Sequence, residues 1–139
     1  MGNQRTIQPY EPADEEQVIE LWRLCGLVVP SGDPSQDIEL KRQMQPELFL
    51  VGIVEERVAA TVVADYDGHH GWLYSLAVAP NLQRRGLGRR MVEEAEARLK
   101  ALGCRRVNLQ IRASNAAVIG FYENLGFSVE ERVSLGRRL

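Results

Sequence analysis

The sequence has few cysteines, few aromatic residues and no excess of positive charge. It carries two cysteines and 6% aromatic residues in 139, and 17 basic residues against 19 acidic ones leave a net charge of −2. Proteins dedicated to nucleic acids usually carry a basic excess that neutralises phosphates, so we expect no nucleic-acid partner. Cys25 and Cys104 form no disulfide framework and lack paired zinc-ligand spacing. We therefore expect buried thiols in a reducing compartment and no bound metal.

Long hydrophobic runs are missing as well. No apolar stretch approaches the roughly 18 residues of a membrane span, and the N-terminus lacks the apolar core of a signal peptide. We therefore expect a cytoplasmic protein without a membrane partner. A hydrophobic content of 45% argues against disorder, and the length fits a single domain, residues 1–139, with a core of its own.

Hydrophobic periodicity predicts a mixed α/β fold. The expected order is strand, two helices, three strands, helix, strand, helix, strand, which indicates a mixed sheet with helices on its faces. The strands are expected at 6–9, 48–54, 57–66, 72–78, 106–111 and 127–135, and the helices at 11–25, 33–44, 86–102 and 115–125.

The segment 83–90 joins a predicted strand to the longest predicted helix and carries the strongest chemical signal. It contains Gly86, Gly88 and four arginines. Glycines let the main chain approach a ligand, and the start of a helix offers unpaired N–H donors and a positive dipole end. The pattern predicts a pyrophosphate cradle, the alternative being a glycine-rich turn with solvated arginines. Nucleotide motifs fail here, because the Lys-Ser/Thr of a P-loop is absent and Met91 replaces the third glycine of a dinucleotide fingerprint.

Two motifs resemble those of the GNAT N-acetyltransferases. Residues 83–88, QRRGLG, match the Q/R-x-x-G-x-G/A motif of that family, and Asn115 followed by 121–127, FYENLGF, matches its second signature. The order of elements agrees too, so the resemblance covers nearly the whole chain. Several short segments, 134–138 among them, are similar to small bacterial YpeA-type acetyltransferases, and 111–115, IRASN, is similar to RimI-type enzymes.

The resemblance implies a mostly antiparallel sheet, splayed between the fourth and fifth strands, and transfer of an acetyl group from acetyl-CoA to a primary amine of a small molecule, amino acid or peptide N-terminus. It implies that main-chain groups near Leu76 and Val78 hold pantetheine and the thioester, that the cradle takes the pyrophosphate, and that Asn115 bonds the pantetheine arm. Tyr122 would be the general acid, since a phenol keeps its proton at neutral pH. The cofactor-binding residues are then Leu76, Ala77, Val78, Gln83, Arg84, Arg85, Gly86, Leu87, Gly88, Arg89, Asn115 and Tyr122.

The general base, the acceptor and the oligomeric state stay open in the sequence. Gln110 occupies the place of a RimI-type glutamate, which leaves Asp65, Asp67, His69, His70 or water to remove the proton. The resemblance places the acceptor near 24–37 and 128–133, where Asp33 and Asp37 would attract a cationic amine. A second copy of the chain, as a homodimer, would be another source of specificity. The competing function is a non-catalytic acyl-CoA sensor, which Tyr122 disfavours and Gln110 keeps open.

Overall fold

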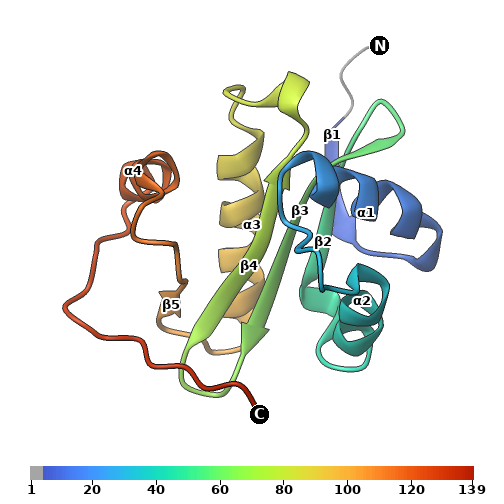
Figure 1. The fold of residues 1–139 in the computed structure, drawn as a ribbon. Coiled ribbons are helices and arrows are strands. Elements are labelled where there is room, and N and C mark those ends of the chain that lie inside the picture. The colour runs from blue at the N-terminus through green and yellow to red at the C-terminus, as the bar shows by residue number, and fades with distance from the viewer. Residues whose placement is uncertain (1–4) are drawn as a thin grey trace. The chain divides into compact units, whose positions relative to one another are not determined.

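The computed structural model describes residues 5–139 and divides the chain into two compact units. The first unit ends at Leu109 and contains the sheet with three of the α-helices, and the second runs from Gln110 to Leu139 and contains the fourth (Figure 1). Within the described residues, no helix is both long and apolar enough to cross a membrane.

The first unit is built on a five-stranded sheet. Its strands are β1 (Arg5–Pro9), β2 (Phe49–Val54), β3 (Arg57–Tyr66), β4 (Gly71–Val78) and β5 (Val107–Asn108), in that spatial order. The first three pairings are antiparallel and the pairing of β4 with β5 is parallel. This confirms the predicted mixed, mostly antiparallel sheet.

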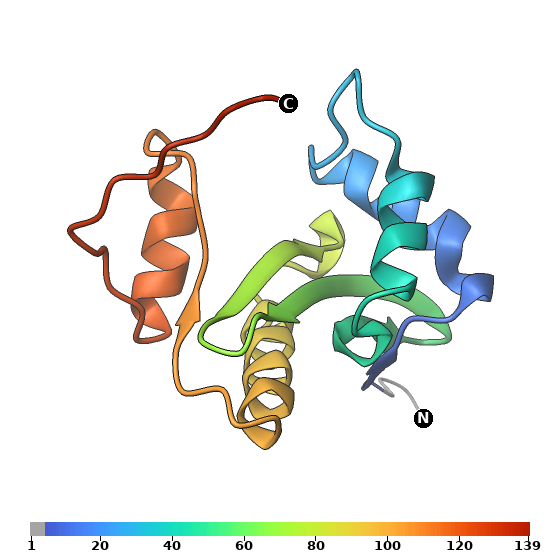
Figure 2. The same cartoon turned by 90° about the horizontal axis from the view of Figure 1, so that it is seen from below.

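Helices cover both faces of this sheet (Figure 2). One face is packed by α1 (Glu15–Leu24) and α2 (Pro34–Arg42), whose buried Val18, Trp22 and Ile38 join the core with β2 and β3. The other face is packed by α3 (Leu87–Ala101), which contacts β2, β3 and β4. Gly52 makes this contact close, because a Cβ there would lie 2.9 Å from the Sδ of Met91. Both faces of the sheet at β2 and β3 are therefore shielded from water, which explains the nearly unbroken apolar runs of these strands.

Prolines and a cap set the helix starts that the sequence predicted. Asp33 is the N-cap of α2, and its carboxylate accepts a hydrogen bond from the Gln36 N–H at 3.1 Å. Pro34 follows at the first helical position, where its missing N–H costs nothing. Short 3₁₀ turns, Pro12–Asp14, Pro46–Leu48 and Pro80–Leu82, precede α1, β2 and the loop before α3.

The sheet opens along β4. Only Gly71 and Trp72 pair with β5, so β4 loses its neighbour on that side for the rest of its length. On the other side the register with β3 shifts between Thr61 and Val63, and Ser75 takes a left-handed φ of +50°. The splay between the fourth and fifth strands is thus confirmed, and it coincides with a bulge in β4.

The last predicted strand, 127–135, is wrong. The second unit contains α4 (Ala116–Asn124), and no strand is assigned after it among its residues, all of which the structure describes. Val129, Val133 and Leu135 are 75%, 86% and 91% exposed. Their alternating pattern suits a strand, but a strand also needs a neighbour for its N–H and C=O groups, and none pairs with this segment. The strand predicted over 106–111 is similarly cut to the two residues of β5.

Candidate active site

The loop before α3 has the backbone shape of a ligand cradle. Arg84 and Gly86 both have left-handed φ angles, +65° and +82°. Gly86 is the N-cap of α3 without a side-chain cap, and the helix ladder begins with the Arg90 N–H donating to the Gly86 carbonyl. A Cβ at Gly86 would meet nothing within 4 Å. The first N–H groups of α3 therefore face an open loop, the arrangement that suits an anion.

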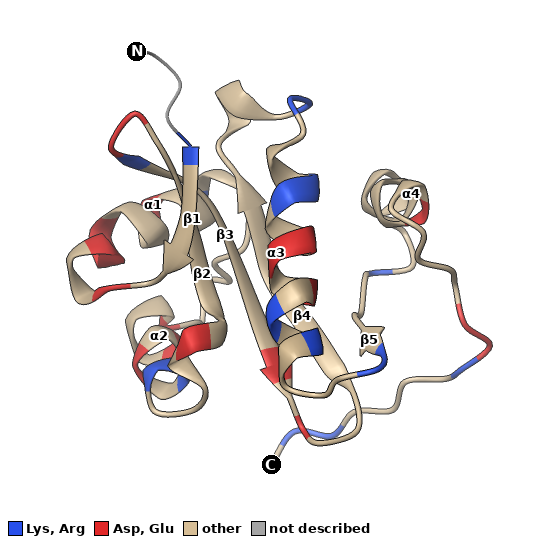
Figure 3. Cartoon of the chain, turned by 180° about the vertical axis from the view of Figure 1, so that it is seen from behind, with Lys and Arg blue, Asp and Glu red and all other residues tan. Residues whose placement is uncertain are grey.

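Positive charge gathers at this end of α3. Arg84, Arg85, Arg89 and Arg90 are all exposed, and Figure 3 shows basic segments in the loop and on the first part of the helix. Arg89 also lies 3.5 Å from Glu93, one turn further along. The four arginines thus add formal charge beside the N–H groups of the helix start.

Gln83 connects the cradle to the open end of β4. Its Nε2 donates to the Val78 carbonyl at 3.0 Å, and the Cys25 thiol donates to the same oxygen at 3.4 Å. The N–H of the next residue, Ala79, donates to the carbonyl of Ala59 in β3, and successive main-chain groups alternate in direction along a strand. The Val78 carbonyl therefore points away from β3, and it already accepts the hydrogen bonds from Gln83 and Cys25. The N–H of Val78 points to the same side of the strand, so it is the main-chain group of this residue that a ligand would meet.

Other predicted contact residues offer only their main chain. The side chains of Ala77 and Leu87 are 3% and 2% exposed and belong to the core. Leu76 is half-buried at the bulge, and Gly88 lies in the first turn of α3. Any ligand at these four residues would have to be recognised by backbone groups.

A buried hydrogen-bond relay holds the bulge of β4. The Trp22 indole N–H donates to the Thr61 hydroxyl at 2.9 Å, and that hydroxyl donates to the Ser75 carbonyl at 2.8 Å. Thr61 is fully buried, and the relay runs from α1 through β3 to the bulged residue of β4. Sequence reasoning missed it, although a lone threonine within the apolar run of β3 was a visible signal.

A pocket of about 410 Å³ lies in the first unit between the segment from α1 to α2 and the strands β3 and β4. Its lining includes Leu27, Val28 and Val29, with Asp33 and Asp37, from the segment that the sequence assigned to the acceptor. Residues that the sequence did not assign also line it, namely Trp22, Ile38, Leu40, Lys41, Tyr74 and Ser75. The bulged part of β4 is thus one wall of this pocket.

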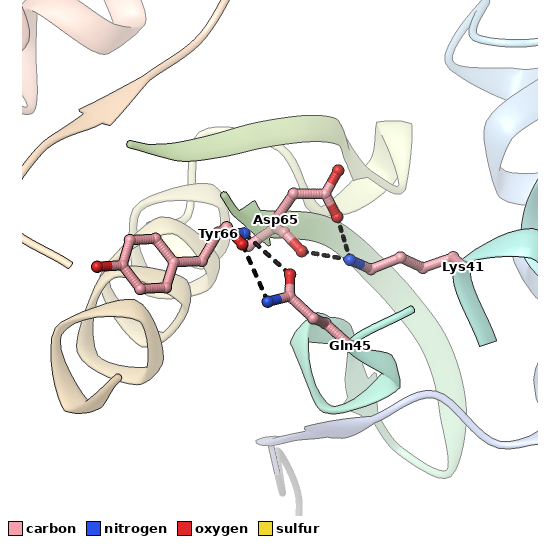
Figure 4. Close-up of polar contacts among 5 residues, drawn as sticks. Lys41, Gln45, Asp65 and Tyr66 are labelled. Carbon is pink, nitrogen blue, oxygen red and sulfur yellow. Dashed lines mark hydrogen bonds and ion pairs between the residues drawn. The ribbon is translucent and has the colours of Figure 1, made fainter. Parts of the chain in front are cut away.

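Lys41 is the ammonium in the pocket lining, and it is engaged. Its Nζ donates to the Ala64 carbonyl at 2.6 Å and forms an ion pair with Asp65 (Figure 4). Beside it, the Gln45 side chain exchanges two hydrogen bonds with the main chain of Tyr66, at 2.9 and 3.0 Å. These contacts attach α2 and the turn after it to the end of β3. Asp65 also faces Tyr74, whose pKa is raised first by partial burial and then by the charge of that carboxylate.

Of the four side-chain candidates for the general base, only Asp65 lines the pocket. Asp67 accepts the N–H groups of His69 and His70, both at 2.7 Å, and these bonds with one from Trp72 lower its pKa to about 2. It therefore acts as the acceptor that shapes the turn. Both histidines lie in this turn, and the course of β4 from His70 to Leu76 spans about 20 Å. The structure thus separates the turn from the bulge.

The second unit holds Asn115 and Tyr122. Asn115 is the N-cap of α4, and its side-chain oxygen accepts the Val118 N–H at 3.2 Å. Tyr122 is buried against the edges of Phe121 and Phe127, with ring centroids 5.0 and 5.3 Å away. Burial raises its pKa to about 12, so the phenol keeps its proton at neutral pH.

Neither cysteine has the features of a nucleophile. Burial raises the pKa of the Cys25 thiol, which therefore stays protonated beside Val78. Cys104 is buried, and its thiol donates to the Arg106 carbonyl at 3.3 Å. Among residues 5–139, no group of three His, Cys, Asp or Glu side chains is placed to hold a metal ion.

Comparison with known proteins gives the family. Residues 15–127 match the Acetyltransferase (GNAT) family. An acetyltransferase of Yersinia enterocolitica is 41% identical over 133 residues, covering 96% of this chain and 94% of the relative. One of Pectobacterium atrosepticum is 40% identical over the same length, with the same coverage of both chains.

Solved structures agree on the fold. The ribosomal-protein-S18-alanine N-acetyltransferase of Escherichia coli superposes with a TM-score of 0.73 at 28% identity, covering 90% of this chain and 78% of that one. Ard1 of Thermoplasma volcanium gives 0.77 at 21% identity, covering 91% and 84%. An aminoglycoside N-acetyltransferase, AAC(6′)-Iy, in complex with CoA, gives 0.74 at 16% identity, covering 99% and 97%. By its motifs, its splayed sheet and its relatives, the chain belongs to the GNAT family of acetyltransferases.

Proposed function

We propose that this enzyme transfers an acetyl group from acetyl-CoA directly to the nitrogen of a primary amine. The observation that carries the proposal is the geometry at the end of β4. An unpaired strand edge leads through a left-handed, arginine-rich loop into the uncapped start of α3. Family membership supports the same chemistry, and the aminoglycoside N-acetyltransferase of similar fold was solved with CoA.

The residues of the first unit suit coenzyme A in two places. The N–H groups from Arg84 to Arg89 would take the pyrophosphate, with the helix dipole and arginines adding attraction. The open edge of β4 near Leu76 and Val78 would bond the pantetheine as an added strand would. We assign Asn115 to the same arm, through the amide group left beside its capping oxygen.

Acetyl-CoA would supply the activated acetyl group as a thioester, and the reaction forms the nitrogen–carbon bond of an amide as the carbon–sulfur bond breaks. A fixed main-chain N–H at the bulge would stabilise the negative oxygen that develops, an effect worth about 3–4 kcal/mol where such a donor has been removed elsewhere. Tyr122 would give its proton to the departing thiolate. The proton of the amine would go to water, because Lys41 holds Asp65 and Asp67 shapes the turn.

We place the acceptor in the pocket between the α1–α2 segment and β4, beside the bulge. We also propose that the two units form one N-acetyltransferase domain, because the family match runs from 15 to 127 across their boundary. A cytoplasmic location is supported by the two unpaired cysteines. The absence of nucleic-acid and membrane partners, and a homodimer, stay predictions.

The test of this function is a panel of primary amines assayed for release of free coenzyme A, together with thermal unfolding. Acetyl-CoA should raise the melting temperature, since a ligand at about 100 times its Kd adds about 2.7 kcal/mol of stability. ATP and NAD should not match it. Binding of acetyl-CoA without acetylation of any amine would favour the non-catalytic acyl-CoA sensor. Equal shifts of the melting temperature with acetyl-CoA, ATP and NAD would contradict both the acetyltransferase and the sensor.

The cradle has its own test in Gly86→Val. The left-handed φ of +82° is strained for a β-branched residue, and the new side chain would enter the open space of the loop. We expect acetyl-CoA to bind at least about tenfold more weakly by calorimetry, a change of about 1.4 kcal/mol. Gly103→Val, at a φ of +97° with equally open surroundings after α3, is the matched control and should keep the affinity. Unchanged affinity in Gly86→Val would remove the cradle from the site.

A further inference from the structure

We propose that the acceptor is a small primary amine with an apolar body and no anionic group, such as an alkylamine or arylalkylamine. The inference rests on the proposed function and adds the chemical class of the substrate. It is carried by three features of the pocket in the first unit: apolar walls, an excess of carboxylates, and a lysine that is already engaged.

The walls select an apolar body. Leu27, Val29, Leu40 and Met44 line the pocket and are 42%, 53%, 53% and 69% exposed, with Trp22 deeper inside. Large apolar side chains that converge on one cavity lose unfavourable contact with water when an apolar ligand covers them. A volume of about 410 Å³ is at the lower end of the range for small-molecule sites. The pocket therefore suits a compact apolar molecule better than a sugar rich in hydroxyl groups.

The charges select a cation. Asp33, Asp37 and Asp65 line the pocket against the one ammonium of Lys41, which leaves the lining with a net charge of −2. Asp37 lies in the first turn of α2, and Asp33 uses one oxygen to cap that helix. An ammonium group entering between these side chains meets an attractive potential, and an anion meets a repulsive one.

The engagement of Lys41 disfavours acceptors that carry a carboxylate or a phosphate. A free amino acid or a phosphorylated amino sugar needs a cation for its carboxylate or phosphate. Lys41 is the cation of this lining, but its Nζ is held by the Ala64 carbonyl and Asp65, and its side chain is 10% exposed. Taking it for a substrate would leave Asp65 without its partner. Amino acids, which the sequence had left as acceptors, are thereby disfavoured.

The test compares phenethylamine with phenylalanine, which differ by one carboxylate, and with phenylalanine amide, in which that charge is removed. Trp22 lines the pocket, so its fluorescence reports binding without turnover once Trp72, the second tryptophan, is replaced in a Trp72→Phe background. We expect phenethylamine to bind at least about tenfold more tightly than phenylalanine, with the amide close to phenethylamine. Ethanolamine, which lacks the apolar body, should bind weakly.

Matched variants test the two halves of the argument. Asp37→Asn should weaken phenethylamine several-fold, and Glu39→Gln, a carboxylate on the same helix outside the lining, should not. Leu40→Gln should weaken it too, whereas Leu102→Gln, a comparably exposed leucine at the end of α3, should leave it unchanged. These readouts separate loss of pocket contacts from a general loss of stability.

The outcomes distinguish this inference from the proposed function. Preferred acetylation of an amino acid or a phosphorylated amino sugar would overturn the substrate class and leave the acetyltransferase standing. Tight binding of phenethylamine without release of coenzyme A would support the class of ligand and contradict turnover. Equal affinity for phenethylamine and phenylalanine, or no binding of phenethylamine, would overturn the inference.

Discussion

Burial decides what the Tyr122 phenol is able to do. Contact with Phe121 and Phe127 removes it from water, which disfavours the charged phenolate and raises the pKa to about 12. The proton therefore stays on the oxygen at any pH at which the enzyme would work. The same shift makes the phenol a weaker acid than a thiol, whose ordinary pKa is about 8.5, so the role we propose is donation to the sulfur as negative charge develops on it.

Tyr122→Phe should keep the ring packing and remove the proton donor. We expect turnover to fall about 10²- to 10⁴-fold, the usual contribution of a general acid, with the Kd of acetyl-CoA nearly unchanged. Steady-state kinetics and calorimetry measure the two quantities. Tyr66→Phe, which removes a hydroxyl that donates to the Gly68 carbonyl in the turn, is the control and should turn over normally. Normal turnover in Tyr122→Phe would exclude it as the acid.

The lowered pKa of Asp67 predicts that its contribution to the free energy of unfolding depends on pH. Its folded-state pKa of about 2 lies below the ordinary 3.8, because the N–H groups of His70 and His69 bond the carboxylate. The stabilisation of the folded state by the ionised Asp67 carboxylate is therefore complete above the ordinary pKa, and it is lost as the pH falls through 3.8 toward 2. Urea unfolding of the wild type and Asp67→Asn should differ more at about pH 7 than at about pH 3.5. An equal difference at both would contradict this role.

At the scale of elements, the bulge in β4 depends on a hydrogen-bond relay that starts on α1 and passes through β3. Trp22 of α1 and Thr61 of β3 together hold the carbonyl of Ser75, where the strand takes its left-handed residue. The bulge moves the main chain of β4 out of register with β3 next to the pocket. The relay thus links the packing of α1 to the strand that we propose holds the thioester.

Thr61→Val should show this coupling, since valine keeps the shape and removes the hydroxyl. The buried Trp22 N–H and Ser75 carbonyl would both lose a partner, and we expect the free energy of unfolding to fall by about 1–3 kcal/mol. Turnover should fall as well, with kcat affected more than KM for the amine. Thr61→Ser keeps the hydroxyl and should restore kcat even if some stability is lost. Equal kcat in the Val and Ser variants would show that the hydroxyl does not position β4.

At the scale of the molecule, the small net charge conceals two regions of opposite local charge. The chain carries −2 overall, while the loop and first turns of α3 carry four arginines and the pocket lining carries −2 by itself. On the proposed function, the anionic coenzyme and the cationic amine would bind in separate regions of one small protein. The composition disfavoured a nucleic-acid partner, whereas the four arginines of 83–90 already indicated one small polyphosphate ligand in the sequence.

Salt should therefore weaken the two ligands to different degrees. Raising ionic strength from about 0.05 to about 0.5 M shortens the Debye length and screens the exposed arginines. We expect the Kd of acetyl-CoA to rise several-fold by calorimetry. The Kd of phenethylamine should rise less, because its apolar contacts are not screened. A Kd of acetyl-CoA that does not change with salt would show that the arginines contribute little to its binding.

The sequence by itself determined the helices, the four longer strands and the glycine- and arginine-rich turn before α3, because these depend on local signals. The apolar stripe of α3, the caps at Asp33 and Asn115, and the glycine at 86 act over a few residues. The predicted strand at 127–135 failed for the opposite reason. Its pattern was local, but a strand is completed only by a neighbour.

Only the tertiary structure decided the site's chemistry. Residues that lie far apart in the chain, Lys41 with Asp65, Cys25 with Val78, and Trp22 with Thr61, meet across elements. No spacing in the sequence predicts such pairs, because each depends on how the helices pack on the sheet. Folding thus brings Asp33, Asp37 and the apolar loop 27–29 into the lining of one negatively charged pocket. It also places the buried Thr61 hydroxyl between the Trp22 indole and the Ser75 carbonyl.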